Sequence, residues 1–320
     1  MNTSTLYNDK GKVVLQWVKN APKSIPSEEV IESIKLASKK FKKFKKYSLK
    51  NVSKLKSLDT NSLTLYNISD MHFGMLALKE ETNDSDWNLD IASKTLDQLS
   101  TELINGADKT EECIICNLGD LIDINDFTHK TPRSGNVLDV DKKFPQILSV
   151  AYNSIINMIY KALGKHKYVY YINIPGNHDI LPSMAVQYII KEHFAGNKRV
   201  ICDESLMNIK YHSFGNVLMA FTHGDNIKMK DVGQIIAFDN KENFVHSKYV
   251  YAYFGHYHVD KVIDTPLCRC ESFRNLAPLN KWASNSGFRR GIGTINSITI
   301  HKSYGEINRR TYNMDMINGN

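Results

Sequence analysis

The chain of 320 residues is 42% hydrophobic, 23% charged and 10% aromatic, an ordinary globular composition with ample sequence for a sizeable core. It has no run approaching the roughly 18 apolar residues of a membrane span, and its first residues lack the charged and apolar regions of a secretory signal. Its five cysteines are too few for a disulfide scaffold, so we expect a cytoplasmic protein.

The net charge of +7 is concentrated near the N-terminus. Residues 1–62 contain fourteen lysines and no arginine against five acidic residues, a net +9, which leaves −2 for the rest of the chain. Within this segment residues 28–47 predict a helix, with Ser27 as N-cap, glutamates in the first turn and lysines in the last. We therefore divide the chain into a small basic, helical N-terminal segment, residues 1–62, and a larger domain, residues 63–320.

The lysine-rich run at residues 39–46 has three interpretations. We rank nucleic acid first as its partner, because clustered lysines neutralise phosphates and Phe41 and Phe44 could stack on bases. A solvated helix face docked on the larger domain is the second interpretation. An anionic membrane comes last, because the apolar stripe of this helix is narrow.

Beyond residue 62 short apolar runs alternate with amphipathic segments. Runs rich in β-branched and aromatic residues predict strands at 62–68, 112–118, 168–174, 217–222 and 249–254. Helices are predicted at 89–104, 144–163 and 184–194, and two later strands fall within 268–274 and 294–301. Alternating strands and helices indicate a layered α/β domain.

Each of the first five strands is followed at once by residues that bind metals. The clusters read Asp70-Met71-His72, Gly119-Asp120-Leu121-Ile122-Asp123, Gly176-Asn177-His178-Asp179, His223-Gly224-Asp225 and Gly255-His256-Tyr257-His258. One such cluster would be explained by turn residues, but five at the carboxyl ends of strands, where open α/β sheets place their sites, indicate a metal centre. We expect strand alternation to point both side chains of Asp-x-His and His-x-His to the same side. Carboxylates, imidazoles and an amide favour Mn, Fe or Zn over Ca.

These blocks resemble the signature of the calcineurin-like metallophosphoesterases, namely D-x-H, G-D-x-x-D, G-N-H-D/E, a lone H and G-H-x-H, in the same order over residues 64–258. The resemblance implies a four-layer α/β/β/α sandwich with two divalent metal ions, Mn²⁺ first, with Fe, Zn, Ni or Mg as alternatives. The implied ligands are Asp70, His72 and His258 for one metal, Asn177, His223 and His256 for the other, and Asp120 as the bridge. His178 would face the phosphate, with Asp123 holding its ring by a hydrogen bond.

A closer likeness, to phage- and prophage-encoded members of this superfamily, extends over residues 80–90, 134–141 and 271–290. Those members are often compared with exonuclease subunits of DNA-repair complexes, a likeness that bears on fold and reaction more than on substrate, and a phage protein would act in the host cytoplasm. The long loop after Asp123 and the later segment supply candidate substrate contacts. They are His129, Arg133, Arg274, Trp282, Arg289 and Arg290. The alternatives are structural packing for the loop and plain solvation for the arginines.

The leading interpretation is a binuclear-metal-dependent phosphodiester hydrolase, a nuclease in which metal-generated hydroxide attacks the phosphorus of DNA. The alternative enzyme is a phosphodiesterase or phosphatase for a small nucleotide or cyclic nucleotide. A third interpretation, a non-catalytic binding scaffold, is disfavoured because none of the expected ligands is missing. A homo-oligomer is compatible with the sequence, although no heptad pattern supports one.

Overall fold

The computed structural model describes residues 2–7, 12–19, 32, 55, 57–289 and 291–318. The chain divides into two compact units, Met1–Phe41 and Lys42–Asn320. In the first unit, strands β1 (Asn2–Tyr7) and β2 (Val13–Lys19) pair antiparallel, so strands occupy part of the segment predicted to be helical. The many β-branched and aromatic residues of β2 favour this conformation. The predicted helix at 28–47 lies outside the described residues except for Glu32, which is helical.

The second unit contains two mixed sheets. The six-stranded sheet has the order β13-β12-β3-β4-β5-β6, in which β3 to β6 are parallel. Its strands are β3 (Asp59–Ile68), β4 (Thr110–Asn117), β5 (Tyr168–Asn173), β6 (Val200–Cys202), β12 (Thr294–His301) and β13 (Gly305–Asn313). The five-stranded sheet has the order β10-β11-β9-β8-β7. Its strands are β7 (Ile209–Phe214), β8 (Val217–Thr222), β9 (Tyr249–Phe254), β10 (Lys261–Asp264) and β11 (Arg269–Ser272). All seven predicted strands are present.

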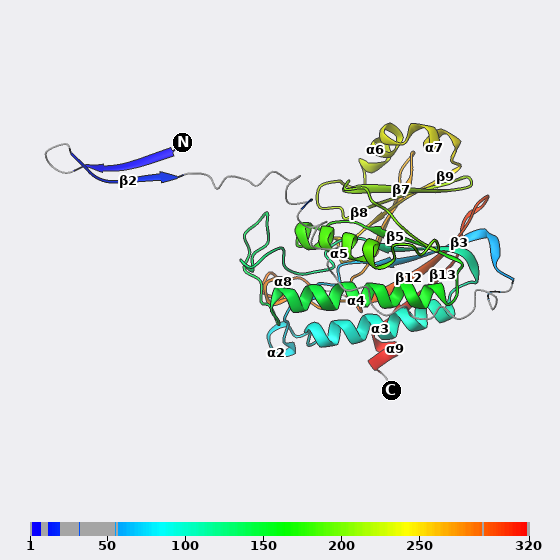
Figure 1. The fold of residues 1–320 in the computed structure, drawn as a ribbon, viewed down its shortest axis with the longest axis horizontal. Coiled ribbons are helices and arrows are strands. Elements are labelled where there is room, and N and C mark those ends of the chain that lie inside the picture. Colours follow the sequence, from blue (N-terminus) through cyan, green and yellow to red (C-terminus); the bar gives the residue numbers. More distant parts are fainter. Residues whose placement is uncertain are drawn as a thin grey trace. The chain divides into compact units, whose positions relative to one another are not determined.

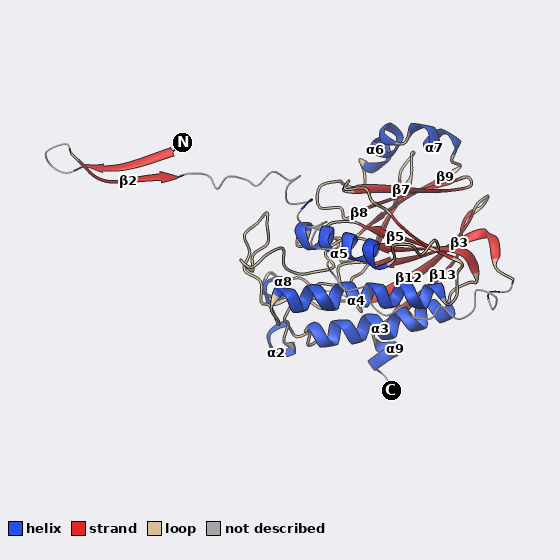
Figure 2. Ribbon diagram, in the orientation of Figure 1, coloured by secondary structure: helices blue, strands red, loops and turns tan. Residues whose placement is uncertain are grey.

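The sheets pack face to face between two helical layers (Figures 1 and 2). Alternation along β3 shows why: Leu63 and Leu65 face the core between the sheets, whereas Tyr66 and Ile68 face the helices on the other side. Strand β8 alternates in the same way between the inter-sheet core and the core beneath α6 (Val232–Asp239). The unit is therefore the predicted four-layer α/β/β/α sandwich.

The outer helices follow the predicted segments closely. Helices α3 (Leu89–Gly106) and α4 (Phe144–Leu163) pack side by side on the six-stranded sheet, and the Asn88 side chain caps α3 (Figure 1). Helix α5 (Ile180–His193) begins four residues earlier than predicted, because Pro182 is tolerated in a first turn. The remaining helices are α2 (Lys79–Thr82), α7 (Lys241–His246), α8 (Lys281–Asn285) and α9 (Asp315–Asn318). Among the described residues, no helix combines the length and apolar character needed to cross a membrane.

His166, buried in the connection between α4 and β5 and hydrogen-bonded to residues of β3 and β4, makes the fold sensitive to pH. Its Nδ1–H donates to the Thr110 carbonyl at 2.9 Å, and its Nε2 accepts from the Tyr66 hydroxyl at 2.8 Å. Burial, with Lys165 nearby, lowers the pKa of His166 to about 4. The unfolded chain therefore binds the proton first, and stability is complete above the unfolded pKa and falls as pH drops below it.

As the pH falls from roughly 7 to 5, we expect the lowered pKa of His166 to reduce the free energy of unfolding by about 2 kcal/mol. His166→Gln should flatten that dependence in urea titrations. His246→Gln, at an exposed position on α7, should keep the wild-type dependence. Identical pH profiles for wild type and His166→Gln would contradict the assignment.

Candidate metal centre

The five predicted clusters lie at the carboxyl ends of β3, β4, β5, β8 and β9, but their side chains converge differently from the prediction. Strand β3 ends at Ile68 and β9 at Phe254, so Asp-x-His and His-x-His lie beyond the strands, and strand alternation does not align them. The side chains are directed instead by backbone in the left-handed conformation. The φ angle is 48° at Asp70, 47° at His72, 50° at Asp120, 65° at His256 and 55° at His258. Non-glycine residues rarely adopt this conformation, and it concentrates at functional sites.

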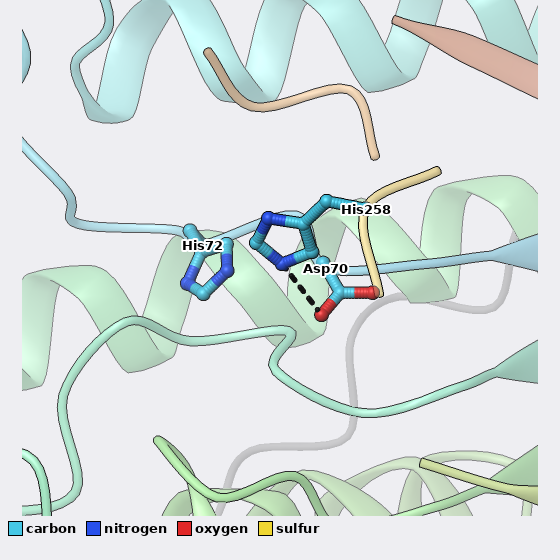
Figure 3. Close-up of side chains that lie close together, drawn as sticks. All are labelled: Asp70, His72 and His258. Atoms are coloured by element: carbon cyan, nitrogen blue, oxygen red, sulfur yellow. Dashed lines mark hydrogen bonds and ion pairs between the residues drawn. The ribbon is translucent and has the colours of Figure 1, made fainter. Parts of the chain in front are cut away.

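The first ligand group is Asp70, His72 and His258, whose donor atoms lie within 4.8 Å of one another (Figure 3). His258 Nε2 is 3.1 Å from Asp70 Oδ1, and the Ser69 hydroxyl and the His256 amide also donate to this carboxylate. Burial opposes ionisation of Asp70, but His258 outweighs it and lowers the pKa of Asp70 to about 2. The structure thus brings together the three residues that the resemblance assigned to one metal.

The second group contains Asp120, His223 and His256, again within 4.8 Å. His223 Nε2 lies 3.2 Å from Asp120 Oδ2 and 3.1 Å from the Asn177 amide oxygen, which adds the fourth residue expected here. The backbone carbonyl of Asp120 accepts from the His72 amide at 3.0 Å. The main chain of Asp120 therefore contacts His72 of the first group, while its carboxylate belongs to the second group.

Asp123 orients two histidines, in a different way from the prediction. Its carboxylate, 1% exposed, accepts from His72 Nδ1 at 2.9 Å, while His178 Nδ1 is 3.4 Å away from the same oxygen. His178 Nδ1–H instead donates to the Asp123 backbone carbonyl at 3.0 Å. Burial opposes charge on His178, but Asp120 and Asp123 outweigh it and raise the pKa of His178 to about 10. The two carboxylates therefore favour the protonated form of His178.

Two motif glycines let backbone segments approach the ligands. A Cβ at Gly176 would lie 2.0 Å from Asp120 Oδ1, and a Cβ at Gly119 would lie 2.5 Å from His223 Nδ1. Gly119 also has a φ of +99°, which L side chains rarely adopt. These residues are glycines because the ligand side chains occupy the space that a Cβ would need.

Asp179 is a site residue to which the sequence analysis assigned no role. Its buried carboxylate accepts from the Gly176 amide at 2.9 Å and the Ile122 amide at 3.2 Å, tying the loops after β5 and β4 together. Burial and the charge of Asp120 raise the pKa of Asp179 to about 6. The sequence feature that could have identified Asp179 as a site residue is its position directly after His178, inside the third cluster.

The donor set fits divalent cations. His72 and His223 each donate through Nδ1, to Asp123 and the Leu118 carbonyl respectively, which leaves Nε2 as the ligand atom, a frequent arrangement in metal sites. The buried carboxylates also stabilise positive charge: burial opposes it, yet Asp120 raises the pKa of His223 to about 10. Cation binding would supply that charge and release protons. Mixed imidazole and carboxylate ligands suit Mn, Fe or Zn.

The predicted substrate contacts are dispersed. His129 and Arg133 are exposed in the loop after Asp123. Arg274 Nε is 3.1 Å from Asp260 Oδ2, and Arg289 donates to the Ser284 carbonyl. Trp282, 54% exposed on α8, lines a cavity that also includes Asp123. Arg290 lies outside the described residues.

No protein-family model and no curated protein matches the sequence. Solved structures do match. One, described as a novel archaeal phosphodiesterase, has 12% identity and a TM-score of 0.40, covering 78% of this chain and 99% of that one. A predicted phosphoesterase from Streptococcus pneumoniae has 10% identity and a TM-score of 0.33, covering 79% and 98%. Entamoeba histolytica Vps29 complexed with zinc has 9% identity and a TM-score of 0.30, covering 78% and 99%. Similarity at this level leaves the chemistry of this chain to be inferred from its own residues.

Proposed function

We propose that this protein is a metal-dependent hydrolase of phosphoesters. The supporting observation is the pair of ligand groups, one formed by Asp70, His72 and His258 and the other by Asp120, His223 and His256, with the His178 amide donating to the Asp120 carboxylate. Divalent cations held there would polarise a phosphoryl oxygen and lower the pKa of water, which is the chemistry that phosphoester hydrolysis needs. Because hydroxide generated by the cations would serve as the nucleophile, we favour direct attack by water over a covalent intermediate.

The chain's own residues would position and protonate the substrate. Asp120 Oδ1 accepts from the His178 amide at 2.8 Å, which fixes His178 next to the bridging position. With Nδ1–H engaged by the Asp123 carbonyl, the Nε2–H of His178 is the proton available for the departing oxygen. Asp123 also stabilises the positive charge on the ring, so His178 would act as the general acid.

Within this class we favour a nucleic-acid phosphodiester, a DNA strand first, with Mn²⁺ as the metal. The +9 charge of residues 1–62 and the exposed Trp282 support a strand as substrate. The net −2 of the remaining chain favours the second candidate, a small nucleotide diester.

The affinity for single-stranded DNA should fall steeply as the salt concentration rises, because binding of lysines to phosphates releases counterions. An affinity that does not change with salt concentration would exclude a nucleic-acid strand as the substrate.

Metal removal tests the reaction class. Chelation by EDTA should abolish hydrolysis of bis-p-nitrophenyl phosphate, and stoichiometric Mn²⁺, Zn²⁺ or Fe²⁺ should restore it, because the residues alone lack a Lewis acid. The same panel should include a phosphomonoester, cyclic nucleotides, and labelled DNA and RNA. Full activity after chelation, verified by metal analysis, would contradict the proposal. Hydrolysis of the monoester alone would replace diester hydrolysis with phosphatase activity.

A further inference from the structure

A cavity of about 330 Å³ adjoins the metal centre and is built by two segments far apart in the sequence. One wall is residues 137–139, in the loop after Asp123, and the other is residues 280–282 with Asn285, on and before α8. Asp123 belongs to the lining, so the cavity begins at the residue that holds His72 and His178. Its volume lies near the lower end of the roughly 300–1,000 Å³ typical of small-molecule sites.

The walls are held by contacts of their own. Lys281 Nζ is 2.6 Å from Glu81 Oε1 on α2, and the Asn280 side chain caps α8 by accepting from the Ala283 amide. On the opposite side the Leu138 amide donates to the His129 carbonyl at 2.9 Å. The cavity is therefore supported before any ligand arrives.

The negative charges of the cavity lining disfavour the binding of a second phosphate group in this cavity. It contributes the carboxylates of Asp123 and Asp139, and its one lysine, Lys281, is already paired with Glu81. Asp123 contributes its negative charge from beneath the cavity surface, because its side chain is buried, whereas Asp139 is exposed. Trp282 and the amides of Asn280 and Asn285 add an aromatic surface and further hydrogen-bonding groups.

We infer that this cavity receives the nucleobase of the nucleotide whose phosphate is hydrolysed. A base is planar, uncharged and rich in N–H donors, and it stacks on aromatic side chains, whereas an anionic group would meet two carboxylates. The inference rests on the proposed phosphoester hydrolysis and adds the place at which the base of a nucleoside phosphodiester, free or within a strand, would bind.

The test compares two substrates with the same leaving group, using the full chain loaded with Mn²⁺. Thymidine 5′-(p-nitrophenyl phosphate) carries a base, and methyl p-nitrophenyl phosphate does not. Trp282→Ala should lower kcat/KM about 10-fold for the nucleoside ester, the loss expected for one stacked base, and leave the methyl ester within about 2-fold. Trp282→Phe should retain most of the preference. Phe238→Ala, which removes an exposed aromatic on α6 outside the lining, is the matched control and should change neither substrate.

Thymidine binding supplies a readout that does not require turnover. Isothermal titration calorimetry should show thymidine binding to the wild type, and Trp282→Ala should weaken that binding about 10-fold. Equal effects of Trp282→Ala on both esters, or unchanged thymidine binding, would overturn the base site. Failure to hydrolyse either ester with any metal would instead contradict the proposed function. If Trp282→Ala also lowers kcat/KM on a single-stranded oligonucleotide, the base belongs to a nucleic-acid strand. If it lowers kcat/KM on the nucleoside ester alone, the base belongs to a free nucleotide.

Discussion

Asp120→Asn should reduce phosphodiester hydrolysis by on the order of 10³-fold or more, the largest effect that we expect from a single substitution. Asp120 Oδ2 faces His223 Nε2 and Oδ1 accepts from the His178 amide. An asparagine removes the negative charge from the second ligand group, and its NH₂ must replace one of the two acceptors. The measurement is kcat/KM on bis-p-nitrophenyl phosphate together with metal content by mass spectrometry.

We expect Asp120→Asn to bind less metal while retaining a native near-ultraviolet circular dichroism spectrum. Asp90→Asn is the matched control, because Asp90 is an exposed aspartate in the first turn of α3. It should keep both activity and metal. Activity within about 10-fold of wild type in a fully metal-loaded Asp120→Asn preparation would remove Asp120 from the site.

His178→Gln should lower kcat by roughly 10²- to 10⁴-fold, the usual range for loss of a general acid, without loss of metal. The glutamine keeps hydrogen-bonding capacity but has no proton to transfer. The loss should be smaller for a p-nitrophenyl leaving group than for an alkyl or nucleoside leaving group, because a stable anion departs without protonation. Steady-state kinetics on the two kinds of diester measure this difference.

His246→Gln again serves as the control and should leave both diesters unaffected. An equal loss with good and poor leaving groups would exclude proton donation and would leave His178 as a residue that only binds phosphate. Loss of metal from His178→Gln would place His178 among the ligands, contrary to its present assignment.

The strands, the four layers and the grouping of ligands could be predicted because they depend on local pattern and on motif order. Apolar runs that end in Asp, His, Asn and Gly place those residues at the carboxyl ends of strands, and topology then brings the ends together. The grouping of Asp70, His72 and His258 follows the predicted assignment, as does the proximity of Asp120, Asn177, His223 and His256. Their roles as metal ligands remain proposals.

Other features depend on geometry that no local pattern encodes. Asp70 and His256 lie beyond the ends of their strands in left-handed backbone, so strand alternation was the wrong basis for predicting side-chain direction. Whether the Asp123 carboxylate contacts His72 or His178 depends on sub-ångström ring positions. The cavity requires residues 137–139 and 280–285 to meet, a contact made only by the tertiary fold.

The division of the ligands between the two sheets has a consequence for assembly of the centre. Asp70, His72, Asp120 and Asn177 follow strands of the six-stranded sheet, whereas His223, His256 and His258 follow strands of the five-stranded one. A folding intermediate with only one sheet formed would offer at most part of either coordination shell. Tight uptake of a cation would therefore wait until the sheets have docked, and the occupied centre would then act as a cross-link that opposes their separation.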